Sequence, residues 1–311
     1  MAKNKFWLII LFAVLIYLIM GIYANFGDLL SAIEKFNWIF IPVMIILTTI
    51  AYFIRFIKWN FFLKSVGVHL NLKDNLFVFF SGLGMIITPA KVGEIWKGWL
   101  IKDINGESLS KTVPVVIIDR VTDLIGLIIL SLLGILYYKE GSYIIIALIV
   151  IFTLFFVAVR SKKVSDIVIS VLEKRAGKYS KDIKTMHTTF EQTMQPKNLV
   201  GMSFLSVFAW FFECLALYFV IIGFGQSISL IISTFVFSFA SLAGAVSMIP
   251  GGLGIAEATT SGMLQYFGLT STISVGVAII IRFGTLWYGA ILGFLVYLIF
   301  KKRIMGETPK T

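Results

Sequence analysis

Charged residues are scarce in this chain of 311 residues. They make up 14% of the sequence, whereas a soluble domain carries about a quarter, and 59% of the residues are hydrophobic. So few charges cannot cover a surface that faces water, so lipid must solvate much of the protein. Segments with period-2 alternation are missing as well, which argues against a transmembrane β-barrel. The sequence therefore predicts an all-α integral membrane protein, because a helix satisfies its own backbone hydrogen bonds in lipid.

The residues and motifs of common enzyme classes are also lacking. Cys214 is the single cysteine, which excludes an intrachain disulfide and a C-x-x-C redox pair, and the two histidines have no motif partners. The glycine-rich residues 251–254 are not a P-loop, because no Lys-Ser/Thr follows them. Asp119 and Asp123 have the spacing of a metal-binding pair on a helix, but Arg120 stands between them. We therefore expect no catalytic residue, no metal and no cofactor.

Basic residues outnumber acidic ones, giving a net charge of +11, but they lie in loops between apolar segments. This placement follows the positive-inside rule and argues against a nucleic-acid partner. The most basic loop, residues 160–197, is predicted to be cytoplasmic, together with both termini. The less basic loops 25–37 and 138–142 are predicted to face outward. The expected location is the cell membrane, with multiple passes.

Six apolar segments are long enough to cross a bilayer. Two further apolar regions are interrupted: one ends at Thr88-Pro89, and the other meets a glycine-rich stretch at Pro250. We expect both to be re-entrant or broken helical hairpins. The predicted spans are 6–24, 38–63, 113–137, 143–159, 199–223 and 272–300, and the interrupted regions are 76–88 and 230–249, the latter followed by 255–267.

The two interrupted regions belong to an internal repeat. Arg120 follows Pro89 by 31 residues, and Arg282 follows Pro250 by 32, and each arginine lies inside a predicted span. The loop charges orient the two copies in opposite directions, which predicts an inverted-topology repeat of the kind found in alternating-access transporters. We expect one membrane domain over 1–311. It divides into 1–37 (first helix and outer loop), 38–137 (repeat one), 138–198 (connecting helix and basic loop), 199–303 (repeat two) and 304–311 (tail).

Ionisable residues inside membrane segments usually face a cavity or a partner. Arg120 is three residues from Asp123 and can pair with it on one helix face. Arg282 has no acidic residue within a turn, so Glu213 and Glu257 are its candidate partners. Two more basic residues, Arg55 and Lys58, lie near the end of the span 38–63 and are expected to snorkel to the interface.

The breaks themselves are candidate headgroup sites. A helix that begins at Pro89 would point free N–H groups at an anion, with Lys91 and Lys97 adding charge that Glu94 can balance. The stretch 250–257 is expected to present bare backbone. The candidate substrate-binding residues are Thr88, Pro89, Lys91, Gly93, Glu94, Lys97, Asp119, Arg120, Asp123, Glu213, Pro250, Gly251, Gly252, Gly254, Glu257 and Arg282.

These motifs resemble a known family. Residues 88–94 (TPAKVGE), Asp119-Arg120, residues 250–257 (PGGLGIAE) and the later Arg282 are similar to the membrane domain of lysylphosphatidylglycerol synthase/flippase proteins and to stand-alone UPF0104-type membrane proteins. The resemblance implies movement of a lipid, since in bifunctional relatives this domain flips aminoacylated phospholipid. A separate soluble domain carries out the aminoacyl transfer there. No such domain is present in these 311 residues, so we expect no lysyl transfer.

The sequence thus favours a flippase-like transporter for a polar-headed lipid, whether phospholipid, glycolipid or polyprenyl-linked. Asp119, Asp123, Glu213 and Glu257 are the acids that could carry protons. One alternative is a membrane-embedded enzyme that acts on a lipid headgroup, with Lys91, Glu94 and Asp119 as its reactive groups. Another is a scaffold that docks a glycosyltransferase or other lipid-modifying enzyme through the loop 160–197.

Overall fold

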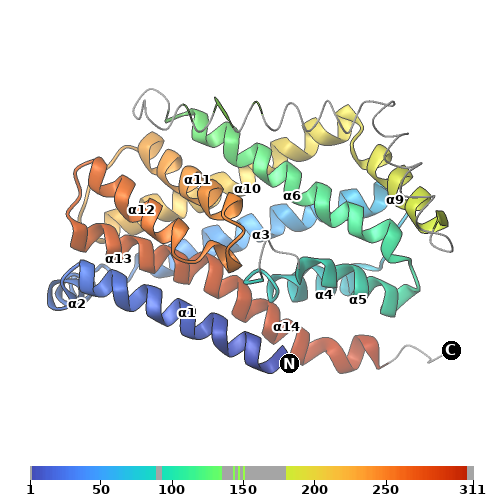
Figure 1. Ribbon diagram of the computed structural model, residues 1–311, viewed down its shortest axis with the longest axis horizontal. Helices are drawn as coiled ribbons and strands as arrows, with labels where there is room; N and C mark the ends of the chain where they lie inside the picture. The colour runs from blue at the N-terminus through green and yellow to red at the C-terminus, as the bar shows by residue number, and fades with distance from the viewer. Residues whose placement is uncertain are drawn as a thin grey trace.

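The computed structural model describes residues 2–88, 93–134 and 180–306, with the helical positions 143, 146, 147 and 150. Every regular element within this part of the chain is helical (Figure 1). In chain order the elements are α1 (Ala2–Tyr23), α2 (Phe26–Glu34), α3 (Phe40–Ser65), α4 (Leu72–Leu83), α5 (Trp96–Asn105), α6 (Leu109–Leu132), α9 (Ser180–Thr193), α10 (Pro196–Gly223), α11 (Leu230–Val246), η3 (Pro250–Gly252), α12 (Ile255–Tyr266), α13 (Ser271–Arg282), η4 (Phe283–Trp287) and α14 (Tyr288–Met305).

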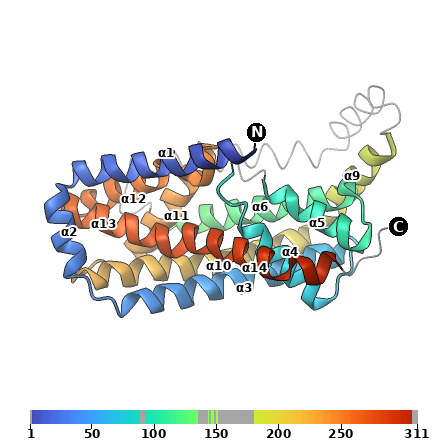
Figure 2. The ribbon, with the colours of Figure 1, turned by 90° about the horizontal axis from the view of Figure 1, so that it is seen from below.

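The longer helices run along a common direction and form an elongated bundle (Figures 1 and 2). Helix α3 packs along α10, which also contacts α6 and α11. Helix α1 lies against α13, and α4 packs on α14. Helix α2 turns across one end of the bundle, bent by 95° from α1.

Three helical segments are long and apolar enough to cross a membrane. They are α3, α10 and the continuous run Ser271–Ile304, and the bent pair α1 and α2 adds a fourth if it counts as one span. Helix α6 has 24 residues and occupies the predicted span 113–137, although it begins and ends several residues earlier. The predicted span 143–159 lies largely outside the described residues. The protein is therefore a helical multi-pass membrane protein, while the count of six spans stays a prediction.

Both predicted interruptions coincide with helix breaks. Helix α4 has only 12 residues and ends at Leu83, and α5 begins at Trp96. Helix α11 ends at Val246, and α12 begins at Ile255 after the short 3-10 turn η3. In this second break Gly251, Gly252 and Gly254 have φ angles of 61°, 66° and 85°, which side chains with a Cβ rarely adopt. We call the interval between α4 and α5 the first break and residues 247–254 the second break, and the glycine φ angles account for the second.

Two helices occupy stretches that were predicted as loops. Helix α2 lies within the predicted outer loop 25–37, and α9 lies within the basic loop 160–197. Helix α9 is stabilised by contacts with the rest of the bundle. Phe190 packs against the hydrophobic cluster formed by α3, α4, α5 and α6, and Asp182 accepts a 3.0 Å hydrogen bond from Ser110 of α6. Residues 160–179 of this loop lie outside the described part.

The last long helical run is interrupted by a π-helical turn. Residues 283–287 form η4 between α13 and α14. The hydroxyl of Tyr52, on α3, donates a 2.6 Å hydrogen bond to the carbonyl of Thr285 within this turn. Such turns are frequent at functional sites, and this one lies beside Arg282.

Candidate functional site

A cavity of about 170 Å³ lies between the two helix breaks. Ile86 and Glu94 of the first break line it, and so do Ile249, Gly251 and Gly252 of the second. Its remaining walls come from α3, α4, α5, α6, α10, α11, α12 and the region around η4. The charged residues that line it are Arg55, Lys97, Arg120, Arg282, Glu94, Asp123 and Glu213.

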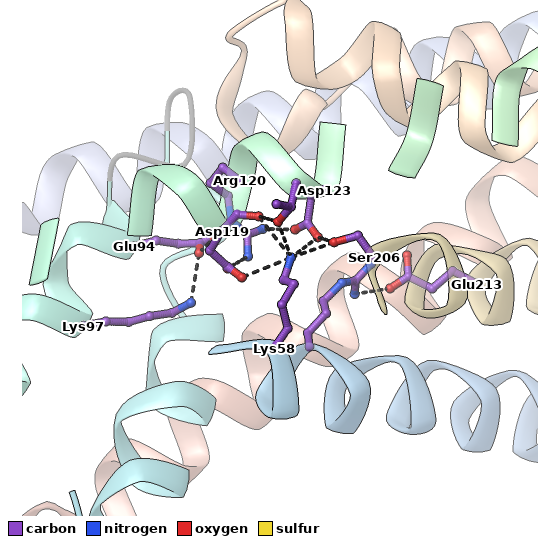
Figure 3. Close-up of polar contacts among 10 residues, drawn as sticks. Lys58, Glu94, Lys97, Asp119, Arg120, Asp123, Ser206 and Glu213 are labelled. Carbon is purple, nitrogen blue, oxygen red and sulfur yellow. Dashed lines mark hydrogen bonds and ion pairs between the residues drawn. The ribbon is translucent and has the colours of Figure 1, made fainter. Parts of the chain in front are cut away.

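Lys58 joins α3 to α6 and α10, next to the cavity-lining Asp123 (Figure 3). Its side chain is fully buried, and its Nζ lies 2.5 Å from Asp123 Oδ1 and 3.0 Å from Asp119 Oδ1. The same amine donates to Thr122 Oγ1, Ser206 Oγ and the Asp119 carbonyl. Five oxygens therefore surround one ammonium group, which compensates the cost of burying it.

Arg120 connects this cluster to the first break. Its guanidinium lies 2.5 Å from Asp119, 3.0 Å from Asp123 and 3.4 Å from Glu94. Glu94 in turn lies 3.0 Å from Lys97 Nζ, and both side chains are buried. The pairing of Arg120 with Asp123 is confirmed, as is the balance of Lys97 by Glu94.

Arg55 forms a separate pair with Glu213 of α10. Its Nη1 lies 2.5 Å from Glu213 Oε1, and its guanidinium lies over the Trp210 ring at 4.3 Å from the ring centre. The expectation that Arg55 and Lys58 snorkel to the interface is wrong. They are 7% and 0% exposed, because α6 and α10 supply acids on the buried face of α3.

Arg282 fastens the second break. Its Nε lies 2.7 Å from Glu257 Oε1, and its Nη2 donates to the Gly251 carbonyl. The other oxygen of Glu257 accepts a 2.7 Å hydrogen bond from the N–H of Gly254. Of the two acids predicted as partners of Arg282, Glu257 is therefore the one in contact, while Glu213 pairs with Arg55.

The backbone of the second break is less bare than expected. The N–H groups of Gly252 and Leu253 donate to the carbonyls of Ile249 and Pro250, and Gly254 donates to Glu257. These three donors are occupied within the break, because its glycine φ angles fold the chain back on itself. The expectation of free donors is wrong for these groups.

In the first break, Thr88 and Gly93 are held together. Thr88 Oγ1 accepts a 2.8 Å hydrogen bond from the Gly93 N–H and donates to the Met85 carbonyl. A Cβ at position 93 would lie 2.5 Å from Thr88 Cγ2, so this contact requires glycine. Pro89 and Lys91 lie outside the described residues, and the anion site predicted at Pro89 stays a prediction.

In the described ranges, no group of three or more His, Cys, Asp or Glu side chains is placed to hold a metal ion. The acids near the cavity contact amines and guanidinium groups instead.

Comparison with known sequences identifies the family. The profile of the lysylphosphatidylglycerol synthase TM region matches residues 9–293. The chain belongs to this family. The matched stretch contains both breaks and every charged residue that lines the cavity, so the site lies within the part that defines the lysylphosphatidylglycerol synthase TM region.

Several archaeal proteins named UPF0104 membrane protein are similar to the chain over most of their length. One from Pyrococcus horikoshii is 25% identical, over 98% of this chain and all of the relative. Another, from Methanothermobacter thermautotrophicus, is 23% identical over 94% of each chain. A third, from Methanocaldococcus jannaschii, is 26% identical over 72% of this chain and 96% of the relative. No solved structure matches. Family membership thus supports a lipid-related role in the membrane.

Thr122, Ser206 and the cavity-lining Arg55 were not among the predicted site residues. Thr122 and Ser206 contact the Lys58 amine, but small hydroxyl residues are frequent in membrane helices and give little signal alone. Their positions gain meaning only once α3, α6 and α10 are packed together.

Proposed function

We propose that the protein is a flippase-like transporter that moves a polar-headed lipid across the bilayer. In this proposal the headgroup occupies the cavity between the two breaks, while the lipid tails stay in the surrounding hydrocarbon. The observation that carries the proposal is the cavity itself, which is lined by both helix breaks and by charged side chains from five helices. A charged headgroup is costly in hydrocarbon, and a polar pocket at that depth lowers this cost.

The charges around the cavity suit an anionic or zwitterionic headgroup. Four cationic side chains line it against three acidic ones, a difference of one positive charge. These groups pair with each other in the structure. A headgroup that enters can exchange contacts with them, so no bare charge is exposed at any stage.

The contacts at the two breaks support the repeat that the sequence predicts. In each half, a glutamate at the break or in the first turn after it pairs with an arginine further along the chain: Glu94 with Arg120, and Glu257 with Arg282. Discontinuous helices in matching positions are the usual substrate sites of inverted-repeat transporters. We propose that the two breaks open in alternation toward opposite sides of the membrane.

The contacts also favour transport over chemistry at the headgroup. An enzyme that uses Glu94 and Asp119 needs at least one of them free to exchange protons with substrate. Glu94 is held by Lys97 and Arg120, and Asp119 by Lys58 and Arg120. Acids in such ion pairs are better suited to holding helices together, in contacts that can break and re-form, than to catalysis.

The test is movement of fluorescent lipids in vesicles that contain the purified protein. Arg282→Gln removes the contacts to Glu257 and Gly251, and we expect it to abolish lipid movement while the protein stays helical and monodisperse. Arg303→Gln is the matched control, since Arg303 is exposed near the end of α14. Normal movement with Arg282→Gln, or no movement with the unchanged protein for any phospholipid or glycolipid offered, would contradict the proposal.

A further inference from the structure

Arg55, which lines the cavity, has an unused hydrogen-bonding edge on its guanidinium. Its Nη1 is bound to Glu213, whereas Nε and Nη2 have no hydrogen-bond partner among the described residues. These two nitrogens lie on the same side of the planar guanidinium. Together they form a fork that matches two oxygens of one phosphate or carboxylate.

Leaving the Nε and Nη2 donors of Arg55 without an acceptor costs free energy. The side chain is 7% exposed, and both free nitrogens are closed to water in this structure. A buried donor without an acceptor costs more than an ordinary hydrogen bond gains, and the cost is larger for a charged group. The ring of Trp210 stacks on the guanidinium, but stacking does not satisfy the N–H groups at its edge. A ligand with two adjacent oxygens would remove this cost.

The other two arginines that line the cavity use their guanidinium nitrogens for contacts within the protein. Arg120 is divided among Asp119, Asp123 and Glu94. The Nε and Nη2 of Arg282, the equivalent edge, are taken by Glu257 and the Gly251 carbonyl. Among the described residues that line the cavity, Arg55 is therefore the arginine whose Nε and Nη2 are both available to a ligand. Glu213 holds the other nitrogen, Nη1, in place.

We infer that the Nε and Nη2 edge of Arg55 binds the phosphate of the lipid headgroup, an inference that rests on the function proposed above. A phosphodiester carries one negative charge and two non-bridging oxygens, and the two oxygens match the two donors of this edge. The cavity of about 170 Å³ has room for such a group. Because the two nitrogens are covered in this structure, the phosphate must displace part of the wall, and the Trp210 ring against the guanidinium is the neighbouring group.

Binding measurements can test this assignment. Purified protein in a neutral detergent is titrated with short-chain phosphatidylglycerol and with a galactosyl diacylglycerol of the same chains, which lacks phosphate. We expect the phospholipid to bind at least about tenfold more tightly. Arg55→Lys keeps the charge but loses the fork, so it should reduce this preference by about tenfold. Arg303→Lys, at an exposed site, should leave it unchanged.

A second variant protects the test against misfolding. Arg55→Gln alone leaves Glu213 buried without its partner, whereas Arg55→Gln combined with Glu213→Gln replaces the ion pair by two neutral amides. The double variant should bind both lipids with similar affinity. Equal binding of both lipids by the unchanged protein, or an unaltered preference in Arg55→Lys and in the double variant, would overturn the inference.

Competition separates the sources of the phosphate. Inorganic phosphate should displace the phospholipid only at concentrations at least about a hundredfold higher, because it lacks the tails. Displacement at equal concentration would assign the edge to free phosphate and overturn the lipid assignment. Equally strong displacement by acetate would overturn the choice of phosphate over carboxylate.

Transport in vesicles separates this inference from the proposed function. Phosphate-dependent binding without lipid movement would refute transport and leave the Arg55 site standing. Equal movement of the phospholipid and the glycolipid would leave transport standing and refute the phosphate site.

Discussion

Replacing Lys58 by methionine tests how the buried charge cluster holds the bundle together. The Lys58 amine is surrounded by oxygens of Asp119, Thr122, Asp123 and Ser206 at 2.5 to 3.2 Å. Methionine has a similar volume but no charge. After the change, the carboxylates of Asp119 and Asp123 share Arg120 as their remaining cationic contact. One buried negative charge is then uncompensated.

Breaking a buried ion pair by removing one partner costs about 3–5 kcal/mol of unfolding free energy. Both carboxylates keep Arg120 as a partner, so we expect the lower end, about 3 kcal/mol. Adding Asp123→Asn should restore the charge balance. The double variant should then recover about half of the loss, about 1–2 kcal/mol, and the coupling energy of the pair is this recovery plus the loss caused by Asp123→Asn alone.

Cys214 makes the measurement direct. It is the single cysteine and is fully buried, so a thiol-reactive fluorescent dye reports unfolding from one known position. Unfolding in mixed micelles is followed for the unchanged protein, both single variants and the double variant. Lys102→Met is the control at an exposed lysine and should lie within about 0.5 kcal/mol of the unchanged protein. If Lys58→Met costs less than about 1 kcal/mol, or the double variant loses the sum of the two single losses, the cluster does not act as an ion-pair network.

Two further predictions concern the second break and the topology. Gly252 has a φ of 66°, and a Cβ there would lie 2.9 Å from the backbone of α11, so Gly252→Ala should lower the unfolding free energy by about 1–3 kcal/mol in the same dye assay. Gly262→Ala, where a Cβ meets nothing within 4 Å, should be neutral or stabilising, and equal losses at both positions would contradict the strain argument. In a variant without Cys214, single cysteines placed in 25–37 should react with an impermeant thiol reagent from outside, and those in 160–197 only after permeabilisation. Outside labelling of 160–197 would refute the inverted arrangement.

Local features of the sequence predicted their parts of the structure well. Pro250 and the glycines after it predicted the second break, because the positive φ angles that glycine adopts there do not fit an α-helix and proline lacks the N–H of a helical hydrogen bond. The contact between Arg120 and Asp123 followed from their spacing of three residues on one helix. The partner of Arg282 could be narrowed to two acids but not chosen, because the choice depends on how α10 and α12 pack beside α13.

The surroundings of α3 could not be predicted in this way. In a soluble helix, the apolar face marks the core, but both the lipid-facing and the core-facing sides of α3 are apolar. A basic residue near the end of such a helix fits an interfacial position as well as a buried one. Arg55 and Lys58 were placed at the interface for this reason, and only their contacts with α6 and α10 show that they are buried.

The pairing of charges around the cavity has a consequence for the response to membrane voltage. Five cationic side chains, Arg55, Lys58, Lys97, Arg120 and Arg282, contact five acids, Glu94, Asp119, Asp123, Glu213 and Glu257, in the described residues. A rearrangement that keeps these partners together carries no net charge through the electric field. The voltage dependence of transport would then come from the lipid alone: none for a zwitterionic headgroup, and about 2.3 kcal/mol per 100 mV for a singly charged one that crosses the whole field.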